Sequence, residues 1–74
     1  MRSGMLWLDT DKRRTLEEKV LRAATYYEEK YGNKPEVCWV NKSEFGEEKE
    51  VAAIQIRPVP NIVAHHFWLG MELS

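Results

Sequence analysis

The sequence predicts a two-layer α+β domain in which one amphipathic helix covers one face of a mixed four-stranded sheet, in the order β-α-β-β-β. Two observations support this prediction. One segment repeats apolar residues with the period of a helix, and four short apolar runs have the length of strands. A chain of 74 residues has room for one domain, so residues 1–74 are expected to form a single unit.

The helix is expected at residues 15–31. Thr15 and Glu18 have the spacing of a capping box, in which each side chain accepts a hydrogen bond from the backbone N–H of the other residue. An apolar stripe then follows at steps of three and four residues: Leu16, Val20, Ala24, Tyr27 and Tyr31. Gly32 favours the left-handed conformation that ends many helices, and Pro35 prevents the helix from continuing.

Four strands are expected, at residues 5–9, 36–41, 51–57 and 65–72, with a polar turn or hairpin loop at 42–50. A strand-helix-strand unit normally forms a right-handed crossover, so the first two strands are expected to run parallel. Both of these strands carry apolar residues at successive positions, which is typical of strands that are covered on both faces. We therefore expect them at the centre of the sheet.

Alternation along the strands sorts their side chains into two faces. The helix is expected to cover one set: Leu6, Leu8, Cys38, Val40, Ile54, Ile56, Phe67 and Leu69. The opposite face is then expected to carry the second set: Trp7, Trp39, Trp68, Val37, Ala53, Gln55, Arg57 and His66. Because one helix cannot cover both sides of a four-stranded sheet, something else must cover the tryptophans.

The face with the three tryptophans is the predicted binding surface, with Arg57, Gln55 and His66 at its rim. Aromatic residues at the centre and polar residues at the rim are typical of protein interfaces. We therefore expect a non-enzymatic interaction module that forms a homodimer or binds a protein partner. Two alternatives remain: the chain's own loops cover the face, or a small molecule or nucleic-acid base stacks on the indoles.

Composition narrows the functional classes. The chain has 11 basic and 12 acidic residues, and this lack of a basic excess disfavours nucleic acid as a partner. Cys38 is the only cysteine, so no internal disulfide can form, and it is expected to be a small buried residue. The chain contains no apolar run of about 20 residues and no signal-peptide pattern, so we expect a cytoplasmic protein without a membrane segment.

Signals for catalysis are weak. Asp9 and Asp11 follow the first predicted strand and, with His66, form the candidate set for metal-dependent phosphate chemistry. The same Asp-x-Asp pattern before a helix is ordinary turn and capping chemistry. His65 and His66 are neighbours that point to opposite faces in an extended strand, so they cannot readily share a metal ion. We therefore predict no catalytic residues, no metal and no cofactor.

Overall fold

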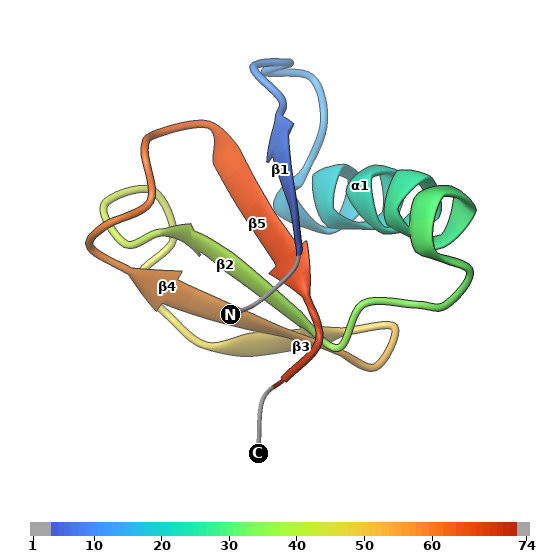
Figure 1. The fold of residues 1–74 in the computed structure, drawn as a ribbon. Helices are drawn as coiled ribbons and strands as arrows, with labels where there is room; N and C mark the ends of the chain where they lie inside the picture. Colours follow the sequence, from blue (N-terminus) through green and yellow to red (C-terminus); the bar gives the residue numbers. More distant parts are fainter. Residues whose placement is uncertain (1–3, 73–74) are drawn as a thin grey trace.

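The computed structural model describes residues 4–72 as one helix and five strands (Figure 1). In chain order these are β1 (Gly4–Leu8), α1 (Leu16–Tyr31), β2 (Val37–Asn41), β3 (Lys49–Val51), β4 (Ile54–Val59) and β5 (His66–Gly70). The strands form one mixed sheet in the order β1-β5-β2-β4-β3. The predicted α+β class is confirmed, whereas the predicted four strands and the order β-α-β-β-β omit one strand.

The helix begins and ends where the sequence predicts. The Thr15 hydroxyl accepts the Glu18 N–H at 3.2 Å, and the Glu18 carboxylate accepts the Thr15 N–H at 3.1 Å, so the capping box is complete. Gly32 has φ 82° and donates its N–H to the Glu28 carbonyl. The buried side of α1 consists of Val20, Ala23, Ala24 and Tyr27. These local contacts fix the position of the only helix in residues 4–72.

Strand β5 lies between β1 and β2 and is antiparallel to both (Figure 1). Strands β1 and β2 therefore run parallel to each other, as predicted, but they are not neighbours. The expectation that both are central is right for β2 and wrong for β1, which forms one edge of the sheet. The reason is that the last strand of the chain occupies the hydrogen-bonding position beside β2 that β1 would have filled.

The core lies between α1 and one face of the sheet. The sheet contributes six buried side chains: Cys38, Val40, Ile54, Ile56, Phe67 and Leu69. These six were all predicted to lie under the helix, and that prediction is confirmed. Leu6 and Leu8 were predicted to join them, which is wrong, because they are 55% and 58% exposed. The β1 residues that pack against the core are Met5 and Trp7 instead.

A tight hairpin joins β3 to β4 where the sequence predicted one strand at 51–57. Val51 pairs with Ile54, and Ala52 and Ala53 form the two-residue turn with φ 50° and 66°. Such turns favour Asn and Gly, because a left-handed conformation costs other residues roughly 1–2 kcal/mol each. Ala53 therefore lies in this turn and not on the face opposite the helix, where it was predicted.

Replacing the turn pair with its preferred residues is expected to stabilise the protein. The double substitution Ala52→Asn with Ala53→Gly relieves two left-handed alanines and is expected to raise the free energy of unfolding by about 1–2 kcal/mol. Urea denaturation measures this change. Ala64→Gly is the control, because φ of Ala64 is not positive, and it is expected to lower stability by about 0.4–1 kcal/mol. A destabilised double variant would contradict the turn assignment.

Candidate functional site

Strand register assembles one row of side chains on the face of the sheet that points away from α1. Trp39 on β2 lies opposite Trp68 on β5, and Leu6 on β1 also lies opposite Trp68. Arg57 on β4 is the register partner of Trp39. Paired residues on neighbouring strands project to the same face. We define the indole face as the accessible side chains that this register and strand alternation place there: Leu6, Leu8, Trp39, Trp68, Gln55, Arg57 and His66. Val37, the register partner of Gln55, lies on the same side as predicted but is fully buried.

Five of the six predicted binding residues share this face: Trp39, Trp68, Gln55, Arg57 and His66. Trp7 does not. Its ring stacks on Tyr26 of α1 with centroids 4.6 Å apart, and it packs against the core. The predicted face of β1 is therefore reversed. Because β1 has large apolar residues at both parities, alternation alone did not decide its orientation, and the bulky indole fills the space beside α1.

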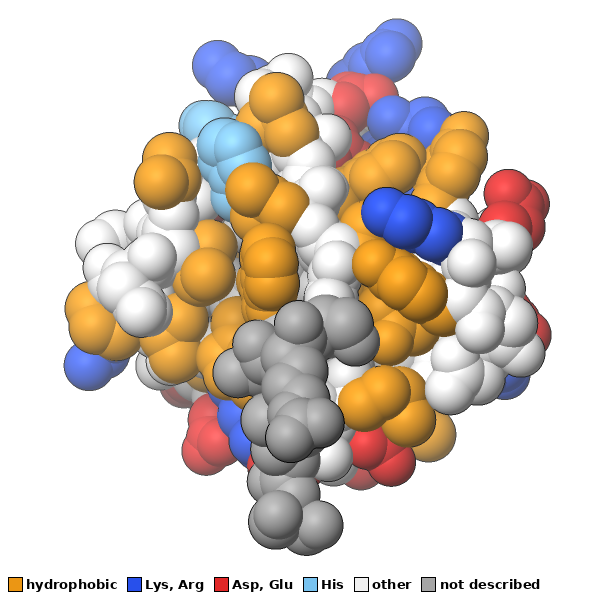
Figure 2. Space-filling model, in the orientation of Figure 1, with side chains coloured by type: hydrophobic (Ala, Val, Ile, Leu, Met, Phe, Trp, Pro, Cys, Tyr) orange, Lys and Arg blue, Asp and Glu red, His pale blue; other side chains and the backbone are white. Residues whose placement is uncertain are grey.

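A shallow apolar groove lies beside the two remaining indoles. It is lined by residues of β2, β4, β5 and the segment that follows β4: Trp39, Val59, Asn61, Ile62 and Trp68. The Asn41 side chain donates a hydrogen bond to the Ile62 carbonyl at 2.7 Å and holds this wall in place. Figure 2 shows a strip of hydrophobic side chains that extends away from the histidines on this side of the molecule.

Sequence reasoning missed the groove wall and the leucines of β1. Val59 and Ile62 follow Pro58 in a stretch without the alternation of a strand. Their apolar character therefore did not indicate on which side of the sheet their side chains would lie. Val63 in the same stretch is 69% exposed. The available signal was the run of apolar residues in a connecting segment, where polar residues are more typical.

Polar side chains at the rim of the indole face on the β4 side pair with other residues of the chain. Arg57 donates two hydrogen bonds to the Glu72 carboxylate, at 2.6 and 2.8 Å. This pairing lowers the pKa of Glu72 and raises that of Arg57, in each case chiefly through the hydrogen bonds between the side chains. The Gln55 amide donates to the Glu50 carboxylate at 2.5 Å. The polar side chains beside the indoles thus contact each other.

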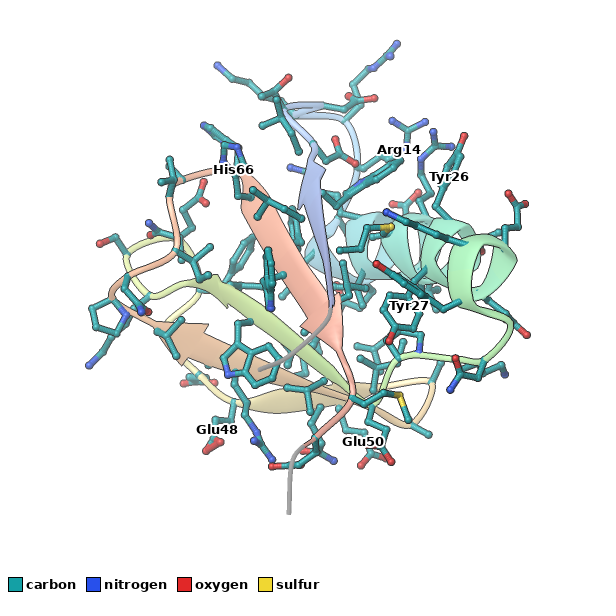
Figure 3. All side chains as sticks on the ribbon, in the orientation of Figure 1. Arg14, Tyr26, Tyr27, Glu48, Glu50 and His66 are labelled. Carbon is teal, nitrogen blue, oxygen red and sulfur yellow. The ribbon has the colours of Figure 1, made fainter. Side chains whose placement is uncertain are left out.

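The two histidines stand at the opposite end of the face, where the chain enters β5. Figure 3 labels His66 at this end, and its Nδ1 lies 2.8 Å from the Ala64 carbonyl oxygen. His65 has φ 64°, donates its backbone N–H to Glu44, and places Nδ1 3.2 Å from the same carboxylate. These contacts fix the segment before β5 and set the start of the strand that carries Trp68.

The acidic pair that suggested phosphate chemistry organises the turn before α1. Asp9 accepts the Asp11 N–H at 2.9 Å, and Asp11 accepts hydrogen bonds from Arg13 and Arg14. The hydrogen bond from the Arg13 side chain is the main cause that lowers the pKa of Asp11 to about 2. In residues 4–72 no group of three His, Cys, Asp or Glu side chains is arranged to hold a metal ion.

Cys38 lies in the core and is fully buried, as predicted. Burial raises the pKa of its thiol to about 12, because the thiolate loses its hydration. We expect the folded protein to resist alkylation by iodoacetamide at pH 8, whereas the protein in urea reacts fully. Mass spectrometry measures both. Rapid labelling of the folded protein would show that the β2 segment opens readily.

Comparisons of the chain with known protein families, with curated proteins and with solved structures found no match. Within the part of the chain that the structure describes, no helix is both long enough and apolar enough to cross a membrane. The functional argument therefore rests on the geometry of the indole face.

Proposed function

We propose that the protein is a non-enzymatic interaction module that forms a homodimer through the indole face. One observation carries this proposal: Leu6, Trp68 and Trp39 form a continuous apolar row, and α1 packs on the other side of the sheet. Leu6 and Leu8 leave more than half of their surface exposed. Large contiguous apolar patches are uncommon on monomers, and buried Trp residues carry much of the binding energy in interfaces.

A second copy suits this face because the charge of Arg57 is already balanced within the chain. The Arg57–Glu72 ion pair leaves no unbalanced charge from these two residues to repel the same residues of another molecule. A two-fold axis in the plane of the sheet would place each apolar row against its equivalent. A standard interface buries about 800 Å² per partner. The molecule measures 29 × 26 × 19 Å, so an interface of this size would occupy nearly the whole of one broad face.

Light scattering over a dilution series tests the proposal. We expect a mass of at least twice the chain mass of 8.7 kDa at high concentration, with dissociation on dilution. The sodium chloride dependence of this mass is expected to be weak, because apolar contacts are not screened by salt. A mass of one chain at every concentration up to about 1 mM would contradict self-association. It would mean that the binding free energy is weaker than about −4 kcal/mol.

The groove beside Trp39 and Trp68 favours a second candidate function, the binding of a flat ring. Aromatic side chains stack on bases with roughly 1–3 kcal/mol per base. Tryptophan fluorescence during titration with nucleotides and short single strands tests this candidate. Quenching that saturates below about 1 mM without a change in mass supports ring binding. Unchanged fluorescence throughout the titration contradicts it and favours self-association.

A further inference from the structure

The edge of β1 presents unpaired backbone groups. β1 is the first strand of the sheet and pairs with β5 on one side only. The Asp9 N–H donates to the His65 carbonyl at 3.0 Å, on the β5 side. Alternate residues of a strand direct their backbone groups to opposite sides. The backbone N–H and C=O groups of Met5 and Trp7 therefore point toward β5. Those of the even-numbered residues, Leu6 and Leu8, point away from the sheet.

Tyr31 provides an independent check of this alternation. Its hydroxyl donates to the Gly4 carbonyl at 2.9 Å, although Gly4 lies in β1 and Tyr31 at the end of α1. The even-numbered residues of β1 thus direct their carbonyl groups away from β5. One end of the edge is closed by Tyr31, and the outward groups of Leu6 and Leu8 have no hydrogen-bond partner among the described residues.

The opposite edge of the sheet is protected, and β1 is not. β3 is only three residues long and contains Lys49 and Glu50, and Lys49 forms an ion pair with Glu17 of α1. Short charged edge strands resist pairing with other chains. β1 has five residues without a charge, GMLWL, and exposes two leucines. An uncharged apolar edge of this kind favours the addition of another strand.

We propose that the β1 edge pairs antiparallel with β1 of a second copy of this chain. Placing Leu6 opposite the partner subunit's Leu8 forms four backbone hydrogen bonds, because each of these residues offers one N–H and one C=O. Trp7 then lies opposite the partner subunit's Trp7. A register that pairs Leu6 with itself would need the Gly4 carbonyl, which Tyr31 already engages. Both registers are two-fold symmetric, but the Leu6–Leu8 register does not use the Gly4 carbonyl that Tyr31 engages.

This pairing creates a surface that is distinct from the proposed face-to-face dimer and does not rest on it. The two-fold axis of the edge pair is perpendicular to the sheet, whereas the axis of the face-to-face dimer lies in the plane of the sheet. Where two perpendicular two-fold axes intersect, they generate a tetramer. The edge pair also brings four leucines together at the seam and joins two indole faces into one continuous surface.

Comparing Leu8→Pro with Leu8→Ala tests the edge, because both variants remove the same leucine side chain from the indole face and differ in the backbone N–H of residue 8. Proline removes the outward N–H of residue 8 and leaves the hydrogen bonds to β5 in place, because these come from the odd-numbered residues. Leu8→Ala is the matched control, since it shortens the same side chain and keeps the N–H. We expect Leu8→Pro to halve the mass of the assembly relative to Leu8→Ala. Equal masses at all concentrations would overturn the proposal.

Trp39→Ala separates the two surfaces. If both operate, the wild type is a tetramer and each single variant is a dimer. If only the edge operates, Leu8→Pro is a monomer and Trp39→Ala remains a dimer, so the proposed function fails and the edge proposal stands. If only the face operates, Leu8→Pro has the same mass as Leu8→Ala and Trp39→Ala is a monomer, which overturns the edge proposal.

Hydrogen exchange tests the edge without any substitution. In the concentrated wild type we expect the amides of Leu6 and Leu8 to exchange on the order of tenfold or more slowly than after dilution to monomers. The amides of Met5 and Trp7 serve as the internal reference, because their bonds to β5 protect them at every concentration. Fast exchange at Leu6 and Leu8 in a sample that is fully associated would overturn the proposal.

Discussion

Phe67→Ala is expected to leave the protein largely unfolded at 25 °C. Phe67 is 1% exposed and is the bulkiest of the fully buried side chains. It sits on β5, the strand between β1 and β2, and its register partners are Trp7 and Val40. Removing a buried Phe ring costs about 3–5 kcal/mol. A domain of this size has roughly 3–5 kcal/mol from its core, so the loss is comparable with its total stability.

Phe45→Ala is the matched control for this prediction. The Phe45 ring lies 6.4 Å from that of Phe67, but it packs at the margin of the core and is only partly buried. We expect it to cost about 1–2 kcal/mol and to leave a cooperative urea transition. Circular dichroism during urea denaturation measures both variants. A Phe67→Ala protein that is as stable as Phe45→Ala would show that β5 is not the centre of the core.

The helix was predictable because its determinants are neighbours in the sequence. Thr15 and Glu18 satisfy each other's backbone across one turn, and Gly32 adopts the left-handed conformation that its missing side chain permits. The apolar spacing selected the buried side correctly at Val20, Ala24 and Tyr27. Each signal operates over a few residues, so no knowledge of the sheet was needed.

The arrangement of β1 was not predictable, because it depends on a strand at the other end of the chain. Trp7 and Leu6 are both large and apolar, so either could have faced the helix. Contact of Trp7 with Tyr26 decides the orientation, and this contact depends on where α1 crosses β1. The insertion of β5 between β1 and β2 likewise follows from hydrogen bonding over about 60 residues, which local patterns do not encode.

The β3–β4 hairpin was missed because its turn lacks the usual residues. Ala52 and Ala53 have neither the glycine nor the asparagine that two-residue turns prefer. The pairing of Val51 with Ile54 overrides this local preference. On the candidate site, strand alternation correctly placed Trp39 and Trp68 together, whereas the groove wall at Ile62 is held by Asn41 through a contact between distant residues.

Trp39→Ala is expected to weaken self-association by more than about 2 kcal/mol, which corresponds to a roughly 30-fold increase in the dimer Kd. Trp39 stands at the middle of the indole face, between Trp68 and Arg57 in the strand register. Truncation at the centre of an interface removes buried aromatic area and admits water. Sedimentation equilibrium over a range of concentrations measures the Kd, and circular dichroism verifies that the variant remains folded.

Leu21→Ala provides the control for the loss of exposed apolar surface. Leu21 is 43% exposed on α1, on the opposite side of the sheet from Trp39. Because the indole face does not include α1, we expect the Kd of this variant to equal that of the wild type. Trp39→Ala protein that associates with the wild-type Kd would contradict the proposed interface. A Leu21→Ala protein weakened as much as Trp39→Ala would instead place the contact on the helix.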